Sequence, residues 1–352
     1  MKIFVVNPGS TSTKVALFED AQCLWTDTQR YEASDLAPYA GVMEQEDFRF
    51  GAISKVLDAR GVSADFAAVV GRGGQMKPVQ GGTYPVNDRM LEDLKNGTHA
   101  SNLGAPLAVR FARAAGDDVP AFIVDPVVVD EMADEARLSG LPEIPRVSIF
   151  HALNQKAVAR RAAADLKKPY EECGLVVAHM GGGVSVGAHD RGRVIDVNNA
   201  LDGEGPMSPE RSGSLPVGGL MDLCFSGRHT AAEIRKMING RGGLVAHLGT
   251  NDMREVEGRI ADGDARATLV FEAMALQIAK EIGSCATVLK GRVDAVVLTG
   301  GLAYSDRLCG RITSRTQFIA PVLRYPGEDE MQALAEGALR VLTGLETPRE
   351  YA

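Results

Sequence analysis

Two short stretches of the sequence, far apart in the chain, share one pattern. VVNPGSTSTKVAL begins at Val5 and VVAHMGGGVSVGA begins at Val176. Each reads as an apolar strand, a polar or glycine-rich turn and a second apolar strand, and the two align without a gap. The pattern predicts a duplicated domain in which each half is built on a β-hairpin. The alternative is a chance similarity between two short hairpins.

The first of these turns has the chemistry of an anion site. It runs NPGSTSTK from Asn7 to Lys14. Its hydroxyls and turn amides are short hydrogen-bond donors, and Lys14 adds the positive charge that a phosphate needs. It is not a Walker A loop, because no second glycine precedes Lys14 and a strand rather than a helix follows. In the second turn glycines replace the hydroxyls, so backbone amides alone would face a ligand. A polar loop that only meets water is the alternative for the first turn.

Length and charge exclude some classes of function. The chain has 352 residues, enough for two domains with full-sized cores. Apolar residues make up 45% and charged residues 24%, which is typical of a soluble globular protein. The net charge of −8 and the absence of a long basic run argue against nucleic acid as a partner. An anionic substrate must therefore meet local positive charge.

Cysteines, histidines and the first residues bear on location and metal content. No two of the five cysteines form a CxxC pair, which favours a reduced, cytoplasmic chain. Met1 and Lys2 lead directly into an apolar strand without the features of a signal peptide, and no apolar run is long enough to span a membrane. The six histidines show no zinc-binding spacing, so the expected metal is Mg²⁺ held by carboxylates and phosphates.

Three residues before the second hairpin stand where ligands are commonly bound. Arg72 follows an apolar strand and is flanked by glycines, which allow a close approach of the backbone. Asp125 follows the apolar run AFIV, at the carboxyl end of a predicted strand. His151 lies in the first turn of a helix predicted from Ser148 to about Leu166, where a helix N-terminus favours an anion. The alternatives are a solvated arginine, a turn or cap aspartate and a buried core histidine.

Glycine and charge gather again in the second half. Arg211 lies in a loop at 202–213 that is dense in glycine, proline and charge. It is either a clamp on a transferred group or one partner of an exposed ion pair. The apolar strand 295–298 leads into Gly300 and Gly301, a turn through which the backbone can approach a nucleotide.

Helical periodicity is clearest near the end of the chain. From about Asp264 to Lys290 an apolar stripe marks a long helix that faces either the core or a subunit interface. A closing helix at 331–342 follows the run GEDE, whose three acids we expect in its first turn, suited to the helix dipole or to a metal held through water. Earlier, a helix at 87–95 is followed by a polar loop at 99–102.

Taken together, these motifs resemble the acetokinase family, on its butyrate kinase branch, within the sugar kinase, Hsp70 and actin superfamily. The resemblance is carried in order along nearly the whole chain. The motifs are NPGSTSTK (7–14), SIFHALNQKAVARR (148–161), VAHMGGGVSVGAH (177–189), DVNNALDGEGPMSPERSG (196–213), GGLVAHLGTND (242–252), VLTGGLAYS (297–305) and YPGEDEMQALAEGALR (325–340).

The resemblance implies an α/β protein with the duplicated actin-like ATPase fold, two domains and a central cleft. It implies an N-terminal domain of residues 1–147 plus 326–352, to which the closing helix returns, and a C-terminal domain of residues 148–325 that carries the adenosine site. It further implies a reversible phosphoryl transfer between ATP and a short-chain carboxylate, with Mg²⁺ as cofactor. For the butyrate branch the products are butyryl phosphate, an acyl phosphate, and ADP.

The resemblance also assigns roles to residues of this chain. Asp125 matches an acid near the metal and the transferred phosphoryl group, and His151 and Arg211 match the pair that stabilises that group. Phosphate and nucleotide contacts are expected at Asn7, Ser10, Ser12, Lys14, His179, Gly181, Gly182, Gly183, Gly300 and Gly301.

Metal and carboxylate contacts are matched less closely. Glu330 is expected at the metal together with Asn7, and Asp329 is a near alternative to Glu330. Acetate kinases have an arginine three residues before a His-Gly-Gly run, but here Val69 stands in that place and Arg72 replaces the histidine. We therefore expect Arg72 to bind the substrate carboxylate.

Two further positions bear on the butyrate branch. Gly182 stands where acetate kinases carry an asparagine, and this difference fits the butyrate branch better. Phe150 precedes His151 and is expected to line the acyl pocket, the alternative being an ordinary core position beneath the helix.

A carboxylate is ionised at neutral pH, so its phosphorylation needs no general base. We therefore expect direct in-line transfer, helped by positioning and electrostatics, although the sequence leaves a phosphorylated Asp125 open. Acetate, propionate or a branched short-chain acid is the rival substrate. A nucleotide-driven binding protein like Hsp70 or actin is the rival of another class, but the two halves consume the 352 residues that it would need for further domains. The apolar helix 264–290 predicts a homodimer or a higher homo-oligomer.

Overall fold

The computed structural model of the chain describes residues 1–96 and 102–352. These residues form two compact units: Met1–Val129 with Asp329–Ala352 is unit 1, and Asp130–Glu328 is unit 2. The domain limits inferred from the sequence, 1–147 plus 326–352 and 148–325, stay a prediction. The loop expected at 99–102 lies outside the described residues, apart from Asn102.

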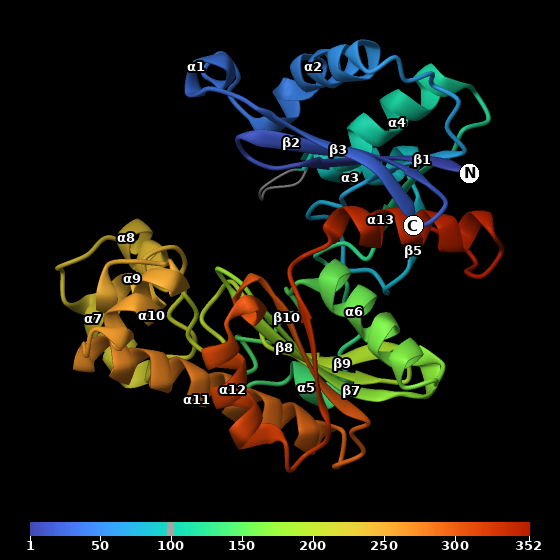
Figure 1. Cartoon of the computed structure of the whole chain (residues 1–352). Coiled ribbons are helices and arrows are strands. Elements are labelled where there is room, and N and C mark those ends of the chain that lie inside the picture. The colour runs from blue at the N-terminus through green and yellow to red at the C-terminus, as the bar shows by residue number, and fades with distance from the viewer. Residues whose placement is uncertain (97–101) are drawn as a thin grey trace. The chain divides into compact units, whose positions relative to one another are not determined.

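Unit 1 combines a mixed sheet with helices from both ends of the chain (Figure 1). Its elements are β1 (Lys2–Pro8), β2 (Ser12–Glu19), β3 (Gln22–Arg30), α1 (Ala33–Leu36), η1 (Val42–Gln45), α2 (Glu46–Ala59), β4 (Ala68–Gly71), β5 (Thr83–Pro85), α3 (Asp88–Asn96), α4 (Gly104–Ala115), β6 (Ala121–Val124) and α13 (Glu330–Leu342).

Unit 2 is built in the same way, with a larger helical insertion between its third and fourth strands. Its elements are α5 (Asp134–Arg137), α6 (Ala152–Asp165), η2 (Tyr170–Glu172), β7 (Gly174–Met180), β8 (Val184–Asp190), β9 (Arg193–Val197), α7 (Val217–Phe225), α8 (Ala231–Ile238), α9 (Gly243–Leu248), α10 (Met253–Ala261), α11 (Ala265–Val288), β10 (Ala295–Gly300), η3 (Gly301–Tyr304), α12 (Asp306–Thr316) and β11 (Val322–Pro326).

The two sheets have the same strand order. Unit 1 runs β3-β2-β1-β4-β6-β5, and unit 2 runs β9-β8-β7-β10-β11. In both, the first three strands of the unit pair antiparallel with their neighbours, and the next two strands in the sheet are added in parallel. β5 is an additional edge strand in unit 1. The shared order agrees with the duplication expected from the two hairpin motifs.

The register of the hairpins corrects the gapless alignment of those motifs. In the first hairpin the pair next to the turn is Pro8 with Thr13, and in the second it is Met180 with Val184. The second turn is therefore one residue shorter. The structurally matched positions are Asn7 with His179 and Lys14 with Ser185, because each pair lies one step from the turn in its own hairpin.

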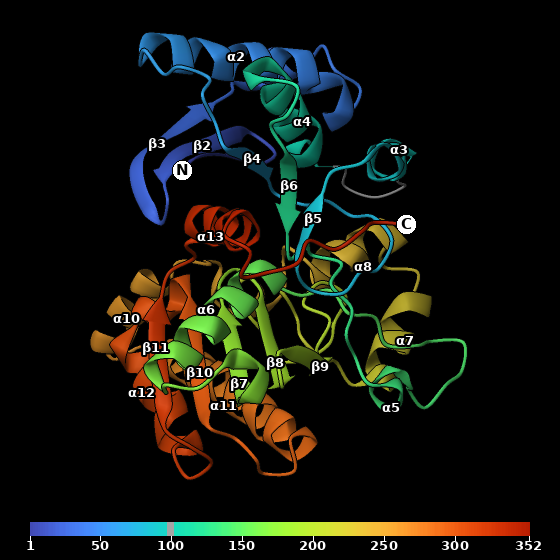
Figure 2. The same cartoon turned by 90° about the vertical axis from the view of Figure 1, so that its right-hand side faces the viewer.

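Helices cover both faces of each sheet (Figures 1 and 2). In unit 2 alternate residues of β7 separate two cores, since successive side chains of a strand point to opposite faces. Val176, Ala178 and Met180 pack with α11, whereas Leu175 and Val177 pack with α6. The apolar stripe of α11 is thus core of its own unit, which decides between the two roles expected for it.

In unit 1, α2 and α4 pack on one face of the sheet, and α13 packs against β1, β4 and β6. Figure 1 shows α13 on the face opposite α2 and α4. Gly337 of α13 lies so close to Val124 of β6 that a Cβ there would come within 2.5 Å of its side chain. The closing helix therefore belongs to the unit that holds the N-terminus.

Helix starts differ from the sequence expectations by a few residues. α6 begins at Ala152 with His151 as its N-cap residue, not at Ser148. α13 begins at Glu330 with Asp329 as its N-cap residue, so only one of the three acids lies in its first turn. Within the described residues, no helix combines the length and apolar character that crossing a membrane requires.

Candidate active site

The first turn is held from below by a residue that the sequence analysis missed. Arg49 of α2 is fully buried and donates hydrogen bonds to the carbonyl oxygens of Gly9 (2.8 Å), Ser10 (2.8 Å) and Ser12 (3.0 Å). Because C=O and N–H point in opposite directions in a trans peptide, the amides that follow Gly9 and Ser10 point away from Arg49. Burial lowers the pKa of its guanidinium. Arg49 thus fixes the turn in a form whose amides can meet an anion.

Three predicted residues of unit 1 meet at one carboxylate. The side-chain amide of Asn7 donates to Glu330 Oε2 at 2.7 Å, and Arg72 Nη1 lies 3.2 Å from the same oxygen. Glu330 occupies the first position of α13, where the helix dipole favours negative charge. The glycines around Arg72 have a structural reason: a Cβ on Gly71 would lie 2.0 Å from the carbonyl oxygen of Gly104.

Asp125 follows β6 and is buried. Its φ of 38° lies in the left-handed region, which is unusual for a residue other than glycine. Its carboxylate accepts a hydrogen bond from the Gly82 amide at 2.7 Å, and the two backbones are also bonded. A strained backbone held by such contacts is common at functional sites. Within unit 1 these contacts anchor Asp125 to Gly82, and its catalytic role stays a prediction.

The second turn is held by hydrogen bonds from a neighbouring loop. Ser208 Oγ donates to the Gly182 carbonyl oxygen at 2.6 Å, and the Glu210 amide donates to the same oxygen at 3.2 Å. Arg211 lies across the turn, so that a Cβ on Gly183 would come within 1.7 Å of Arg211 Nη1. With Arg211 in this position, residue 183 has no room for a side chain.

The guanidinium of Arg211 is oriented by acceptors on both sides. Nη1 donates to the Ala200 carbonyl oxygen at 2.6 Å, and Nε donates to Asn239 Oδ1 at 3.2 Å. Burial lowers the pKa of Arg211, partly offset by Glu210, which raises it. Asn239 also lines a cavity of ≈ 410 Å³ together with Asp202, Arg235, Lys236 and Ile238.

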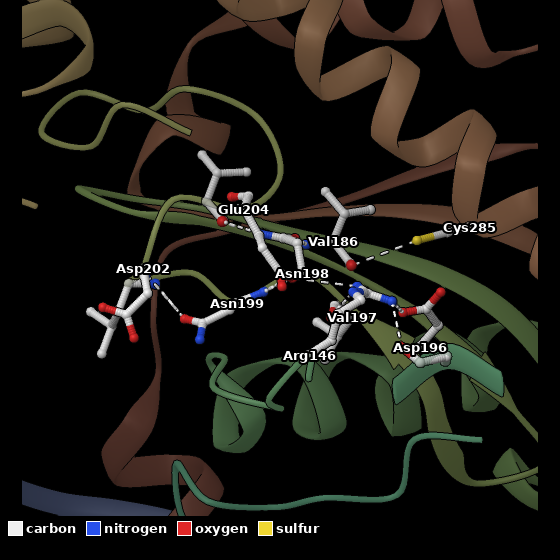
Figure 3. A network of polar contacts seen from close by, with 12 residues as sticks. Arg146, Val186, Asp196, Val197, Asn198, Asn199, Asp202, Glu204 and Cys285 are labelled. Carbon is white, nitrogen blue, oxygen red and sulfur yellow. Dashed lines mark hydrogen bonds and ion pairs between the residues drawn. The ribbon is translucent and has the colours of Figure 1, made fainter. Parts of the chain in front are cut away.

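Figure 3 shows a polar network around Arg146, Asp196, Asn199 and Glu204. Arg146 pairs with Asp196 at 2.8 Å and with Glu204 at 3.4 Å. Glu204 in turn accepts the amide of Asn199 at 2.9 Å, next to Ala200. The loop that presents the Ala200 carbonyl to Arg211 is therefore tied to one arginine.

Two histidines of unit 2, His151 and His179, lie beside the second turn. The rings of His151 and His179 stack with centroids 3.8 Å apart, and His151 Nδ1 is 2.9 Å from Ser185 Oγ of β8. His179 is buried; its Nδ1 is 2.8 Å from Asn154 Oδ1, and its Nε2 is 3.1 Å from Glu328 Oε1. The Glu328 contact meets the distance of an ion pair without being a hydrogen bond.

The remaining predicted residues lie at strand and helix ends of unit 2. Gly300 has φ 88°, and a Cβ there would lie 2.4 Å from the Met180 carbonyl oxygen, so the ends of β10 and β7 require this glycine. Gly301 opens η3 with free space around its Cα. Phe150 is buried, 2% exposed, next to the start of α6.

The structure thus brings the predicted residues together in two groups. Unit 1 gathers Asn7, Arg72 and Glu330, while His151, His179, Arg211 and the glycine turn lie along the β7–β8 hairpin of unit 2. Sequence reasoning missed Arg49, Ser208 and Ser185. The two serines lie inside motifs that the resemblance used, but no local pattern distinguished Arg49.

The chain is similar in sequence to known proteins of one family. The model of the acetokinase family matches residues 131–313. Butyrate kinase 1 and butyrate kinase 2 of Clostridium acetobutylicum are 52% and 54% identical to this chain, and each alignment covers 99% of both sequences.

Solved structures share the fold at low sequence identity. The acetate kinase of Porphyromonas gingivalis superposes with a TM-score of 0.82 at 20% identity, over 97% of this chain and 99% of that one. A propionate kinase from Francisella tularensis superposes with a TM-score of 0.73 at 21% identity, over 96% and 98%. A hexokinase from Thermus thermophilus, with a TM-score of 0.52 at 16% identity over 98% and 100%, shares the general fold. The fold is the duplicated α/β fold of the actin-like ATPases, and the chain belongs to the acetokinase family.

Proposed function

We propose that this protein is an ATP-dependent carboxylate kinase that reversibly converts butyrate and ATP to butyryl phosphate and ADP. The butyrate kinases that share more than half of its residues over nearly the full chain support this substrate. The observation that carries the proposal is the pairing of Arg211 with the glycine turn: a guanidinium held across backbone amides is suited to the charge of a transferring phosphoryl group.

The reaction needs no general base and depends on how the reacting groups are positioned. The carboxylate attacks the γ-phosphorus of ATP in line, the bond to the β–γ bridging oxygen breaks, and ADP leaves. We assign Arg211 and His151 to the equatorial oxygens, and Asp125 to the surroundings of the transferred group. Arg72 is assigned to the substrate carboxylate, which it can pair in the bidentate manner of arginine.

The nucleotide and its phosphates are assigned to the glycine and hydroxyl turns. Ser10, Ser12 and Lys14 contribute donors from the first turn, and Gly181–Gly183 contribute amides beside His179. Gly300 and Gly301 are assigned to adenosine, since the turn at the end of β10 leaves the Cα of Gly301 open.

The Glu330 carboxylate and the Asn7 amide fit a magnesium ion. Mg²⁺ is commonly held by one or two carboxylates, with water and substrate phosphates completing its shell. When bound, Mg²⁺ neutralises phosphate charge. Glu330 is held in place by Asn7 and Arg72.

A hydroxamate assay of acyl phosphate formation tests this function. The purified protein is incubated with ATP, Mg²⁺ and, separately, acetate, propionate, butyrate, isobutyrate or valerate. We expect the highest kcat/KM with butyrate. A preference for acetate, propionate or isobutyrate would replace the substrate but keep the reaction. No acyl hydroxamate with any acid would leave the nucleotide-driven binding protein as the better account.

Phe150 is proposed to line the acyl pocket. Each buried methylene contributes about 0.8 kcal/mol, so two more carbons favour butyrate over acetate by about 1.6 kcal/mol, roughly fifteen-fold. Phe150→Ala should raise KM for butyrate more than KM for acetate and leave KM for ATP nearly unchanged. Phe318→Ala, at a phenylalanine that is 83% exposed, is the control. If all three constants moved together, Phe150 would be a packing residue.

A homo-oligomer and a cytoplasmic location stay predictions. The α11 stripe that motivated the oligomer is core, but α7 exposes Val217, Met221 and Phe225. Analytical ultracentrifugation at micromolar concentration decides between monomer and oligomer.

A further inference from the structure

A chain of hydrogen bonds leads from His151 into the core of unit 2. His151 Nδ1 lies 2.9 Å from Ser185 Oγ, which lies 2.8 Å from Gln155 Nε2. Gln155 Oε1 lies 3.0 Å from His189 Nε2, and His189 Nδ1 lies 2.8 Å from the Tyr170 hydroxyl. Ser185, Gln155 and His189 are fully buried. Each hydrogen bond needs one donor and one acceptor. Once the donor and acceptor atoms of one member are known, those of its neighbours in the chain follow.

The direction is set at Gln155. Its Nε2 also lies 3.0 Å from the Ser185 carbonyl oxygen, which can only accept. The group that faces Ser185 must therefore be the NH₂ of Gln155, and its carbonyl oxygen must face His189. This assignment of the amide follows from its surroundings, as it must where hydrogens are not seen.

The protonation of His189 is consistent with this orientation of the Gln155 amide. Gln155 Oε1 can only accept, so His189 Nε2 carries a proton. Burial, and then the charges of Lys156 and Arg160, hold the pKa of His189 well below its ordinary value, so the ring is neutral. Its Nδ1 is then unprotonated and accepts from the Tyr170 hydroxyl.

The hydroxyl of Ser185 links Gln155 to the ring of His151. Ser185 Oγ accepts from Gln155, and its other contact besides the His151 ring is the His151 backbone amide at 3.5 Å, which is a donor. Among the residues that the structure describes, the acceptor within reach of the hydroxyl proton is His151 Nδ1. The proton of a neutral His151 ring therefore sits on Nε2.

We infer that Ser185 and Gln155 are positioning residues that hold His151 as the neutral tautomer protonated on Nε2. The inference rests on the proposed function for its consequence: His151 then meets the transferring phosphoryl group as a hydrogen-bond donor and not as a base. A donor is what the equatorial oxygens need, because a carboxylate nucleophile has no proton to give up.

The tautomer can be read directly by NMR. Protein labelled with ¹⁵N in its histidines is studied by long-range ¹H–¹⁵N correlation, which distinguishes protonated from unprotonated ring nitrogens. His151→Gln identifies the signals of His151. We expect Nε2 of the protonated kind and Nδ1 of the unprotonated kind in the free protein at neutral pH. The reverse tautomer, or two protonated nitrogens, overturns the inference without any variant.

Ser185→Ala then removes the donor to Nδ1. The tautomers of His151 should become mixed, and kcat should fall about tenfold, as for other residues that orient a reacting group. KM for butyrate should change much less. Ser54→Ala, which removes a hydroxyl that donates to the Phe50 carbonyl oxygen within α2, is the matched control and should alter neither the tautomer of His151 nor kcat. An unchanged tautomer in Ser185→Ala contradicts the inference.

Gln155→Met is the second variant in case Ser185→Ala fails to fold. It leaves the Ser185 hydroxyl free to turn, so a mixed tautomer of His151 is again expected, and a retained single tautomer counts against the chain. The NMR result does not depend on activity. A protein with the expected tautomer but no acyl phosphate formation would refute the proposed function and leave the inference standing.

Discussion

The two hairpins of the molecule show two ways to hold an anion-binding turn. In β1–β2 the turn keeps its hydroxyls, and a buried cation beneath it, Arg49, binds its carbonyl oxygens. In β7–β8 the turn has only glycines, and it is fixed by the loop that carries Ser208 and Arg211. The first turn carries side chains and is supported through its carbonyl oxygens by Arg49. The second turn carries no side chains, so that Arg211 can lie directly against it.

The matched positions of the two hairpins also differ in their exposure to solvent. Lys14 is exposed in the first, whereas Ser185, one step from the turn in the second, is buried against His151. Asn7 and His179 are also matched, and each faces a glutamate of the GEDE run, Glu330 and Glu328 respectively. One backbone pattern thus supports a directly exposed charge in one unit and a buried chain of hydrogen bonds in the other.

The largest effect is expected where the first turn loses its support. Arg49→Ala leaves several buried carbonyl oxygens without donors and should lower the free energy of unfolding by about 4 kcal/mol. Urea unfolding followed by circular dichroism measures it. Arg60→Ala, at a half-exposed ion pair with Asp27, should cost less than about 1 kcal/mol. Equal losses in the two variants would mean that Arg49 does not hold the turn.

The second turn is tested by adding a methyl group. Gly183→Ala must displace Arg211, and kcat for acyl phosphate formation should fall at least a hundredfold, about 3 kcal/mol in the barrier. Gly9→Ala in the first turn meets nothing closer than 3.6 Å and should cause a much smaller loss. If Gly9→Ala were as harmful as Gly183→Ala, the two turns would be equally crowded by ligand and the comparison would fail.

Substitution of Glu330 or Glu328, the glutamates that face the matched residues Asn7 and His179, should give a smaller and more specific effect. Glu330→Gln should raise the Mg²⁺ concentration for half-maximal activity about ten- to a hundredfold, because the carboxylate is its proposed ligand. Glu328→Gln, which removes the charge facing His179, should leave that concentration nearly unchanged. Titration of activity with Mg²⁺ at saturating ATP distinguishes them. A larger shift in Glu328→Gln would move the metal assignment to the other acid.

The smallest effect concerns one tyrosine in each unit at high pH. Burial and a hydrogen bond to a carboxylate, Asp93 and Asp165 respectively, raise the pKa of Tyr351 and of Tyr325 to about 12. The unfolded chain loses these protons near pH 10. The folded state binds them more tightly, so the stability that they contribute is present below about pH 10 and is lost as the pH rises to about 12.

Urea unfolding at several alkaline pH values tests this contribution. The change of pKa from about 10 to about 12 corresponds to roughly 2.7 kcal/mol, and screening by solvent reduces it to about 1 kcal/mol per residue. Tyr351→Phe and Tyr325→Phe should each flatten the decline. A decline of unchanged slope in both variants would assign the alkaline sensitivity to other groups.

The sequence alone determined the repeated hairpin and hence a duplicated domain, and the resemblance carried by its motifs implied the fold class. Strand periodicity and turn residues are local signals, and two copies of one local pattern predict two sheets of one topology. The residue types of the turns also predicted where donors for an anion would gather. These features depend on neighbours within a few residues, which the sequence states directly.

Only the tertiary structure decided which distant residues meet. The hairpins differ by one residue in register, which an ungapped alignment hides. Arg49 reaches the first turn from a helix whose sequence marks no such role, and neighbouring acids of the GEDE run contact Asn7 in one unit and His179 in the other. Such contacts are set by how whole elements pack, because a periodic pattern records which face is buried but not which partner buries it.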